Sequence, residues 1–324
     1  MYPLNRNRRL RSKESLRNLI RESSLHPNDF IAPLFVTEGS KIKEEIPSMP
    51  NYYRLSLDNL KKEIKTLWSI GVQAVLIFVK VSDEFKDNIG TEAVNRNGLM
   101  QRAIKEIKNC VPEITIISDI ALDPYSIYGH DGIVKNNLIL NDETNDVLCE
   151  MALSHAEAGV DIVAPSDMMD GRVLSIRKAL EKNNFDNTAI MSYGAKYASS
   201  FYGPFRNALE SNPGFGDKKT YQMDFANRKE AIVEIAADIE EGADIIMIKP
   251  GISYLDIVYE TKNSFNIPLA VYQVSGEYAM VKAASKMGYL DHNKIMMEQL
   301  ISIKRAGANM IASYFAKDAI KLIS

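Results

Sequence analysis

The sequence predicts an α/β fold, a (β/α)8 TIM barrel that carries an extended arm at its N-terminus. Eight short, apolar, β-branched runs alternate with helical patterns, as expected for parallel strands that are covered on both sides. Glycine also recurs at four places where a helix ends and a strand begins. Eight alternating βα units favour a closed barrel, with a doubly wound open sheet as the alternative.

The candidate strands begin after a short N-terminal segment and continue to the C-terminus. They are Phe30–Val36, Val72–Val79, Ile114–Ile120, Val160–Pro165, Ala189–Gly194, Ala243–Pro250, Pro268–Ser275 and Asn309–Phe315. Between them, Leu55–Ile70 carries apolar residues at helical spacing. A second helix is expected over Glu230–Glu241, where Asn227 has the identity of an N-cap with Glu230 three places on.

Four glycines mark the expected helix ends, because glycine accepts the left-handed backbone that terminates a helix. They precede the second, fourth, sixth and eighth strands and are Gly71, Gly159, Gly242 and Gly307. Their regular placement supports the strand count. We therefore expect residues 26–324 to form one barrel, with no second domain.

Residues 1–25 differ from the rest of the chain because basic side chains outnumber acids there. The basic residues are Arg6, Arg8, Arg9, Arg11, Lys13, Arg17 and Arg21. This segment could be an arm that reaches a neighbouring subunit, a solvated basic tail or a transit peptide. Charge alone favours the tail.

Composition excludes several classes of protein. The net charge of −3 implies no strong attraction to nucleic acid or to a membrane surface. The longest apolar runs are strand-length, whereas a membrane helix needs roughly 20 apolar residues. Cys110 and Cys149 are the only cysteines and are far apart in sequence, which argues against a disulfide scaffold and fits a reducing cytosol. No signal peptide is visible at the start.

Two lysines lie where the active site of such a barrel is expected, at the C-terminal ends of the strands. Lys196 follows the fifth strand and Lys249 ends the sixth. Adjacent strands are about 5 Å apart, so the two ammonium groups would repel each other in a partly dry pocket. Both effects lower a lysine pKa and free a nucleophilic amine for Schiff-base formation. The alternative is that a strand-end lysine only extends to water, as expected for Lys80.

Acidic residues gather after the third and fourth strands. Asp119, Asp123 and Asp131 follow the third strand, and Ser166 begins the acid-containing segment after the fourth. Carboxylates there could bind a hard cation or a substrate ammonium. Ordinary turn chemistry explains the same residues equally well.

Residues 197–220 form a long segment that contains Gly203, Gly214 and Gly216, and long barrel loops with glycine hinges are often lids. Arg206 and Lys218 could meet an anionic substrate group there. The alternative is a solvated surface loop with ordinary cations.

Several segments together resemble the porphobilinogen synthase (5-aminolevulinate dehydratase) family, from about residue 6 to the end of the chain. They are Arg8–Arg11, Ala164–Arg172, Met191–Lys196, Phe201–Arg206, Tyr221–Asp224, Ile248–Gly251 and Tyr272–Tyr278. This family condenses two molecules of 5-aminolevulinate into porphobilinogen, the pyrrole of tetrapyrrole and haem synthesis, with loss of two waters. A class I Schiff-base aldolase is the alternative enzyme, and a barrel without catalysis is a third possibility.

The resemblance assigns roles to individual residues. It implies that Lys249 forms the Schiff base with the first substrate and that Lys196 engages the second. Ser275 and Tyr314 match positions that hold the first carboxylate, and Arg206, Lys218 and Gln222 match those that hold the second. Substrate contacts are also expected of Asp119, Asp123, Asp131 and Ser166, where the aspartates would take the second ammonium, a monovalent ion or a hard divalent ion.

The resemblance also implies an ion, an assembly and a location. Glu234 falls where many members bind an activating, allosteric Mg²⁺, although composition alone favours a solvated acidic face. No zinc is expected, because Ala121, Asp123 and Asp131 stand where zinc-dependent members carry three cysteines. The family is usually a homo-octamer built from dimers that exchange N-terminal arms. Only five residues precede the family-like start, so we expect no transit peptide and a cytoplasmic location.

Overall fold

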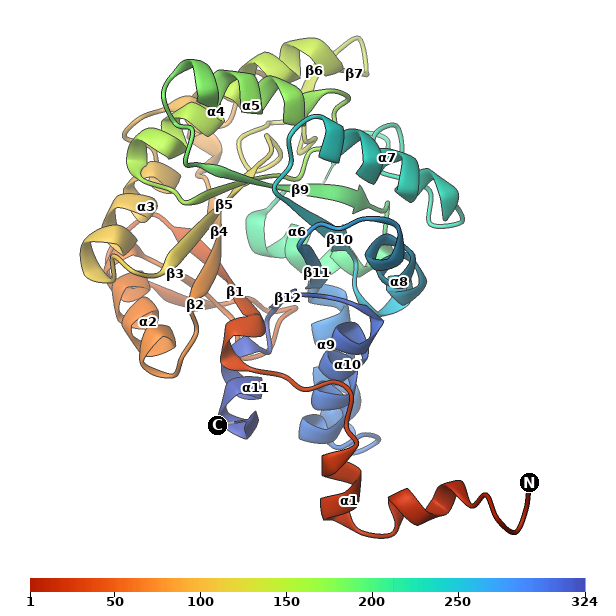
Figure 1. Ribbon diagram of the computed structural model, residues 1–324. Helices are drawn as coiled ribbons and strands as arrows, with labels where there is room; N and C mark the ends of the chain where they lie inside the picture. The colour runs from red at the N-terminus through yellow and green to blue at the C-terminus, as the bar shows by residue number, and fades with distance from the viewer. Residues whose placement is uncertain (212, 324) are drawn as a thin grey trace.

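The computed structural model describes residues 1–211 and 213–323, and its centre is a closed barrel of eight parallel strands (Figure 1). The eighth strand pairs with the first, which closes the sheet and confirms the barrel. In chain order the strands are β1 (Phe30–Thr37), β4 (Ala74–Lys80), β5 (Thr115–Ile120), β8 (Ile162–Pro165), β9 (Ala189–Lys196), β10 (Ile245–Lys249), β11 (Leu269–Gln273) and β12 (Met310–Ser313). Each expected strand is present, and no end is shifted by more than two residues.

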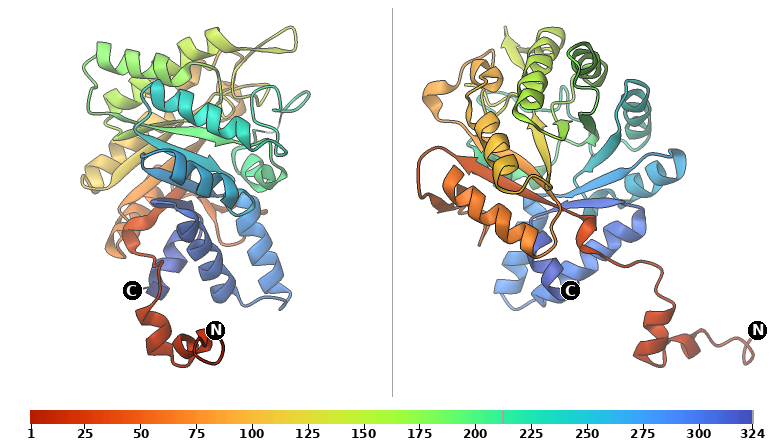
Figure 2. Two further views of the ribbon diagram at one scale, coloured as in Figure 1. Left: turned by 45° about the vertical axis from the view of Figure 1, so that its right-hand side comes forward. Right: turned by 60° about the vertical axis from the view of Figure 1, so that its left-hand side comes forward.

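Helices form a layer around the barrel (Figure 2). They are α2 (Leu57–Ser69), α3 (Leu99–Cys110), α4 (Asn141–Ala158), α5 (Arg172–Lys182), α7 (Lys229–Glu240), α8 (Leu255–Ser264), α9 (Ser275–Lys286), α10 (His292–Ala306) and α11 (Ala316–Ile323). In α2, for example, Leu60, Ile64 and Leu67 are buried at helical spacing. The strands are therefore apolar on both faces because one face fills the barrel and the other receives such helices.

The glycines behave as expected, but the cap of α7 does not. Gly71, Gly159, Gly242 and Gly307 all have positive φ, between +97° and +127°. The N-cap of α7 is Arg228 and not Asn227. The Asn227 amide instead donates to the Glu230 carboxylate at 2.7 Å, so the expected capping interaction was wrong.

Several elements extend the barrel where its strands end. β3 (Tyr53–Leu55) pairs in parallel with β1, and β2 (Lys43–Glu45) pairs antiparallel with β3. β6 (Ile133–Lys135) and β7 (Leu138–Leu140) make a separate hairpin. The segment expected as a lid contains η5 (Ser200–Tyr202) and α6 (Gly203–Leu209). The short helices η2 (Pro27–Asp29), η3 (Asp83–Phe85), η4 (Thr91–Val94) and η6 (Ile252–Tyr254) complete the connections.

The N-terminal arm projects away from the barrel in all three views (Figures 1 and 2). It contains η1 (Asn7–Arg11) and α1 (Glu14–Leu19), neither of which buries a residue. Apolar side chains are exposed on it, namely Leu10, Leu19 and Ile20. The arm thus has no core of its own. Across the described residues, every helix is too short or too polar to cross a bilayer.

Candidate active site

The two lysines lie side by side at the C-terminal ends of β9 and β10. Lys196 and Lys249 are paired in the register of these strands, and both are buried. They line one small cavity of ≈ 20 Å³, whose wall brings together most of the expected residues. The lining is Asp123, Lys196, Tyr202, Phe205, Arg206, Lys218, Gln222 and Lys249. Lys80 lies elsewhere and pairs with Glu210 at 2.5 Å.

A β-bulge in β9 sets the direction of its side chains. Two residues lie between Ser192 and Ala195 in β9, whereas one residue, Met247, lies between their partners in β10. An extra residue of this kind shifts the alternation of side chains between the two faces. Tyr193 therefore lies with its ring 5.2 Å from the Lys249 Nζ, while Lys196 also reaches the cavity.

Lys249 has an aromatic environment. Its Nζ lies within 4.8–5.2 Å of four ring centroids, those of Tyr193, Tyr202, Phe205 and Tyr272. Among the described residues, no carboxylate lies within ion-pair distance of it. Burial, followed by repulsion from Lys196, lowers the pKa of Lys249 to about 7. A large share of this amine is therefore neutral and nucleophilic near neutral pH.

Lys196 has a polar environment instead. Its Nζ lies 3.0 Å from the Asp131 carboxylate and donates to the backbone carbonyl of Ser166. Asp131 also accepts from Lys218 at 2.5 Å, and Asp123 lies 3.5 Å from the same lysine. Burial raises the pKa of Asp131, but the two lysines lower it further, so the net shift is downward. Ser166 thus contacts Lys196 through its backbone carbonyl oxygen and not through its hydroxyl.

Two acceptors near the lysines lack partners. Asp119 Oδ1 and Gln222 Oε1 are buried and make no hydrogen bond within the described structure. Burial, then repulsion from Asp123, raises the pKa of Asp119 to about 7. Since a buried unpaired acceptor is unfavourable, these atoms suit a bound donor such as an ammonium group or a cation.

Ser275 and Tyr314 lie on the Lys249 side but do not line the small cavity. The Ser275 hydroxyl accepts from the Phe205 amide at 2.9 Å and donates to the Phe201 carbonyl at 3.3 Å. The Tyr314 hydroxyl lies 2.7 Å from that of Tyr272, whose ring borders Lys249. In this conformation both hydroxyls contact protein groups.

A buried glutamate that the sequence did not single out connects the loops after β10 and β11. Glu277 accepts from the amides of Val274, Gly251 and Ile252 at 2.7, 3.3 and 2.5 Å. Gly251 follows Lys249 by two residues, and Val274 precedes Ser275. The only sequence signal was an acidic residue in the first turn of the helix after the seventh strand.

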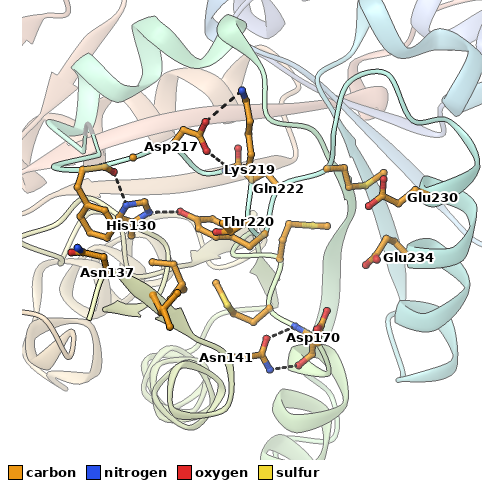
Figure 3. A pocket seen from close by; sticks show the side chains of 18 residues that line it. His130, Asn137, Asn141, Asp170, Asp217, Lys219, Thr220, Gln222, Glu230 and Glu234 are labelled. Atoms are coloured by element: carbon orange, nitrogen blue, oxygen red, sulfur yellow. Dashed lines mark hydrogen bonds and ion pairs between the residues drawn. The ribbon is translucent and has the colours of Figure 1, made fainter. Parts of the chain in front are cut away.

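Glu234 lies on α7 beside a second, larger cavity of ≈ 700 Å³ (Figure 3). Asp170 and Glu230 line the same cavity. Burial raises the pKa of Glu234, Arg172 opposes this, and Asp238, Asp170 and Glu230 raise it again. No group of three side chains within the described residues is arranged to ligate a metal directly. A hydrated ion that needs only one or two carboxylates fits this donor set, as Mg²⁺ does.

Comparison with known proteins identifies the family. The model of the family "Delta-aminolevulinic acid dehydratase" matches residues 4–322. The chain belongs to the delta-aminolevulinic acid dehydratase family. It is therefore an enzyme, a lyase, and this assignment removes the aldolase alternative and the barrel without catalysis.

Relatives and a solved structure agree along almost the whole chain. The Bacillus subtilis dehydratase is 51% identical over 320 residues, covering 99% of this chain and 98% of its own. The chloroplastic dehydratase of Glycine max is 49% identical, covering 99% of this chain and 78% of its own. The crystal structure of the Toxoplasma gondii dehydratase (porphobilinogen synthase), in complex with the reaction product porphobilinogen, has a TM-score of 0.97 and 46% identity. That match covers 98% of this chain and 91% of the other.

Proposed function

We propose that this dehydratase condenses two molecules of 5-aminolevulinate into porphobilinogen through imines on Lys249 and Lys196. The observation that carries the proposal is the environment of Lys249, a buried amine with a pKa of about 7 that lies in register with a second lysine. The similar Toxoplasma gondii structure contains porphobilinogen as the reaction product. Formation of this pyrrole places the chain in tetrapyrrole synthesis.

Lys249 acts as the nucleophile toward the first substrate. Its neutral amine attacks the ketone carbon, the C–N bond forms, and the carbonyl oxygen leaves as water. The resulting imine is a better electron sink than the ketone, so the neighbouring C–H is easier to deprotonate. Lys196, held by Asp131 and the Ser166 carbonyl, engages the second ketone.

Charged and polar side chains hold the two substrates in one site. Arg206 and Lys218 are assigned to the second carboxylate, with Gln222 beside them, and Ser275 and Tyr314 to the first. Charge-assisted hydrogen bonds of this kind fix both position and orientation. Holding two substrates together turns a bimolecular reaction into a local one.

Substrate entry requires that the residues lining the small cavity from η5 and α6, together with Lys218, move apart. A cavity of ≈ 20 Å³ has room for about one water molecule. The Ser275 hydroxyl is hydrogen-bonded to a backbone amide of α6, and Lys218 is paired with Asp131. Such a movement would release both groups for the substrate carboxylates.

We also propose that the enzyme binds hard cations such as Mg²⁺. Glu234, with Asp170 and Glu230 nearby, would hold a hydrated Mg²⁺ with an allosteric role. Asp119, Asp123 and Asp131 would take the second ammonium, a monovalent ion or a hard divalent ion, and not zinc, which prefers thiolate and imidazole. Metal analysis of active protein tests this, since stoichiometric zinc whose removal abolishes activity and whose return restores it would overturn the assignment.

The family resemblance and the exposed arm support a proposal for the assembly and the location. We propose a homo-octamer in which dimers exchange their N-terminal arms, because η1 and α1 bury no residue in their own subunit and the arm exposes apolar side chains. We place the enzyme in the cytoplasm.

The direct test is to incubate the purified protein with 5-aminolevulinate and to assay the pyrrole colorimetrically. We expect porphobilinogen from the wild type and a loss of several orders of magnitude in Lys249→Ala, because that variant cannot form the imine. A wild type that forms no pyrrole with any hard cation present, or a Lys249→Ala variant with full turnover, would refute the proposal.

A further inference from the structure

The guanidinium of Arg54 joins the β2–β3 hairpin to the last turn of α6. Arg54 is buried on β3. Its Nε donates to the Ala208 carbonyl at 2.6 Å and its Nη2 to the Asn207 carbonyl at 2.8 Å. Its Nη1 pairs with Glu44 at 2.7 Å. All three nitrogens are thus engaged, two of them with one short helix more than 150 residues away in sequence.

The two carbonyls are groups that a helix cannot satisfy by itself. The last four carbonyls of an α-helix lack an intrahelical partner, and a cation near that end also complements the helix dipole. α6 has only seven residues, and so short a helix is not stable without tertiary contacts. Its placement therefore depends on what packs against it, and Arg54 supplies the contact at its C-terminal end.

Neighbouring cations strengthen the same connection. Lys80 at the end of β4 pairs with the Glu210 carboxylate at 2.5 Å, and Lys86 donates to the Glu210 carbonyl at 3.3 Å. Glu210 directly follows α6 and adopts a left-handed backbone, with φ of 52°. Three cations thus fix the end of the helix. They are Arg54 on the hairpin, Lys80 at the end of β4 and Lys86 in the segment after β4.

Glu44 holds the guanidinium in this direction. It lies opposite Arg54 in the antiparallel register of β2 and β3. Its carboxylate forms an ion pair with Nη1, so Nε and Nη2 can donate to the two carbonyls of α6. This arrangement gives the small hairpin, which is not needed to close the barrel, a function at the site.

α6 carries two residues of the active site. Phe205 has its ring 4.8 Å from the Lys249 Nζ, and Arg206 lines the cavity shared by both lysines. We propose that Arg54 is a positioning residue for the second substrate, because it fixes α6 so that Arg206 meets the second carboxylate. This inference rests on the proposed function, in which Arg206 and Lys218 hold that group while Lys249 captures the first substrate.

Three variants and one control test the inference. Arg54→Met removes both hydrogen bonds to α6, and Arg54→Lys keeps the charge but not the planar fork. Glu44→Gln removes the negative charge and so weakens only the support of Nη1. Arg102→Met is the matched control, because Arg102 likewise pairs with a glutamate, Glu38, and donates to a backbone carbonyl, that of Asn97, away from α6. For each protein, KM and kcat are measured with 5-aminolevulinate, and borohydride labelling of Lys249 reports capture of the first substrate.

We expect Arg54→Met to raise KM about tenfold or more, since charged hydrogen bonds of this kind are lost, while Lys249 is labelled as in the wild type. Arg54→Lys should raise KM by less than Arg54→Met does, and Glu44→Gln should raise it about twofold to fivefold. The KM of Arg102→Met should equal that of the wild type. Hydrogen exchange within residues 203–211 should be faster in Arg54→Met and in Glu44→Gln.

An unchanged KM in a folded Arg54→Met protein would overturn the inference. A rise in KM that is accompanied by a loss of Lys249 labelling would also overturn it, because it would show a general structural role. If Arg54→Met does not fold, the KM and the Lys249 labelling of Glu44→Gln test the inference, and an unchanged KM in that variant would overturn it. A wild type that neither labels nor forms pyrrole would refute the proposed function instead, so the two failures are distinguishable.

Discussion

Lys249 and Lys196 have the same side chain and lie side by side, yet their surroundings give them different chemistry. Lys249 is enclosed by aromatic rings, and Lys196 pairs with Asp131. Burial penalises the charged form of Lys249, and the neighbouring cation adds to the effect. The pair therefore presents one amine that titrates near neutrality beside one that is held by a carboxylate.

This difference predicts the pH dependence of imine formation. Below pH about 7 Lys249 is increasingly protonated and cannot attack a ketone, so the rate of labelling by 5-aminolevulinate and borohydride should fall as the pH is lowered. Lys196→Met removes a repelling cation, so the pKa of Lys249 should rise and the acid limb should move to higher pH. Lys304→Met, which removes a lysine paired with Asp29 at 2.7 Å, is the control and should not move it. An acid limb at the same pH in Lys196→Met would contradict this account.

The sequence predicted both lysines from their positions at strand ends, but it did not predict the rings around Lys249. Tyr193 and Lys196 are three residues apart, and simple alternation would send them to opposite faces. The bulge between Ser192 and Ala195 changes that alternation, and no local pattern in the sequence marks it. The hydrogen bonds of the Ser275 hydroxyl with the backbone of Phe201 and Phe205 depend on long-range packing, so the sequence could not predict them either.

At the scale of elements, the N-terminus of α9 meets η5 at Gly276. A Cβ at this position would lie 2.5 Å from the Phe201 carbonyl oxygen and 2.7 Å from its Cα. Both are backbone atoms, so one of the two elements has to shift when a side chain is added.

Gly276→Ala should therefore displace η5 and lower kcat/KM for 5-aminolevulinate by at least tenfold, as small misplacements of a site do. Gly203→Ala is the control, because Gly203 has helical backbone and open space around its Cβ position. Alanine there should leave activity intact and favour α6 slightly. Steady-state kinetics and thermal unfolding of both variants check this, and wild-type kcat/KM in Gly276→Ala would disprove the close packing.

α7 provides the second prediction at this scale. If Glu234 holds an activating Mg²⁺, then Mg²⁺ should raise the activity of the wild type, and Glu234→Gln should lose that response, because a neutral amide is a poor ligand for a hard cation. Titration of activity and of assembly size with MgCl₂ measures both. Glu240→Gln, on the exposed side of the same helix, should respond as the wild type does. The site is wrong if Mg²⁺ has no effect, or the same effect in Glu234→Gln.

Elements with a strong repeating pattern were predictable, and those fixed by tertiary contacts were not. The eight strands and the four helix-ending glycines follow from local preference. β2, β3 and α6 are too short to carry a pattern, and α6 depends on Arg54 from a distant part of the chain. Asn227 has a capping identity, but its side chain bonds to Glu230 and not to the backbone.

At the scale of the whole molecule, the two helices of the arm, η1 and α1, bury no residue against their own subunit. The apolar residues Leu10, Leu19 and Ile20 of the arm are exposed, and the arm extends beyond the barrel (Figure 1). Burial of such side chains against a second copy would be favourable, by about 25 cal/mol for each Å² of apolar surface.

Removal of residues 2–20, which include η1 and α1, should therefore yield a smaller assembly than the octamer proposed for the wild type, with the barrel still folded. Light scattering after size-exclusion chromatography measures the assembly, and circular dichroism checks the fold. Leu19→Ser within the full chain should weaken the assembly in the same direction. An octamer that forms without the arm would exclude arm exchange as its basis.

The central claim is that Lys249 forms an imine with the first substrate. The most direct measurement is to mix the protein with 5-aminolevulinate, reduce with borohydride and locate the adduct by peptide mass spectrometry. We expect the adduct on the peptide that contains Lys249, and its absence there in Lys249→Ala. An active wild type with no adduct on Lys249 or on Lys196 would contradict the account.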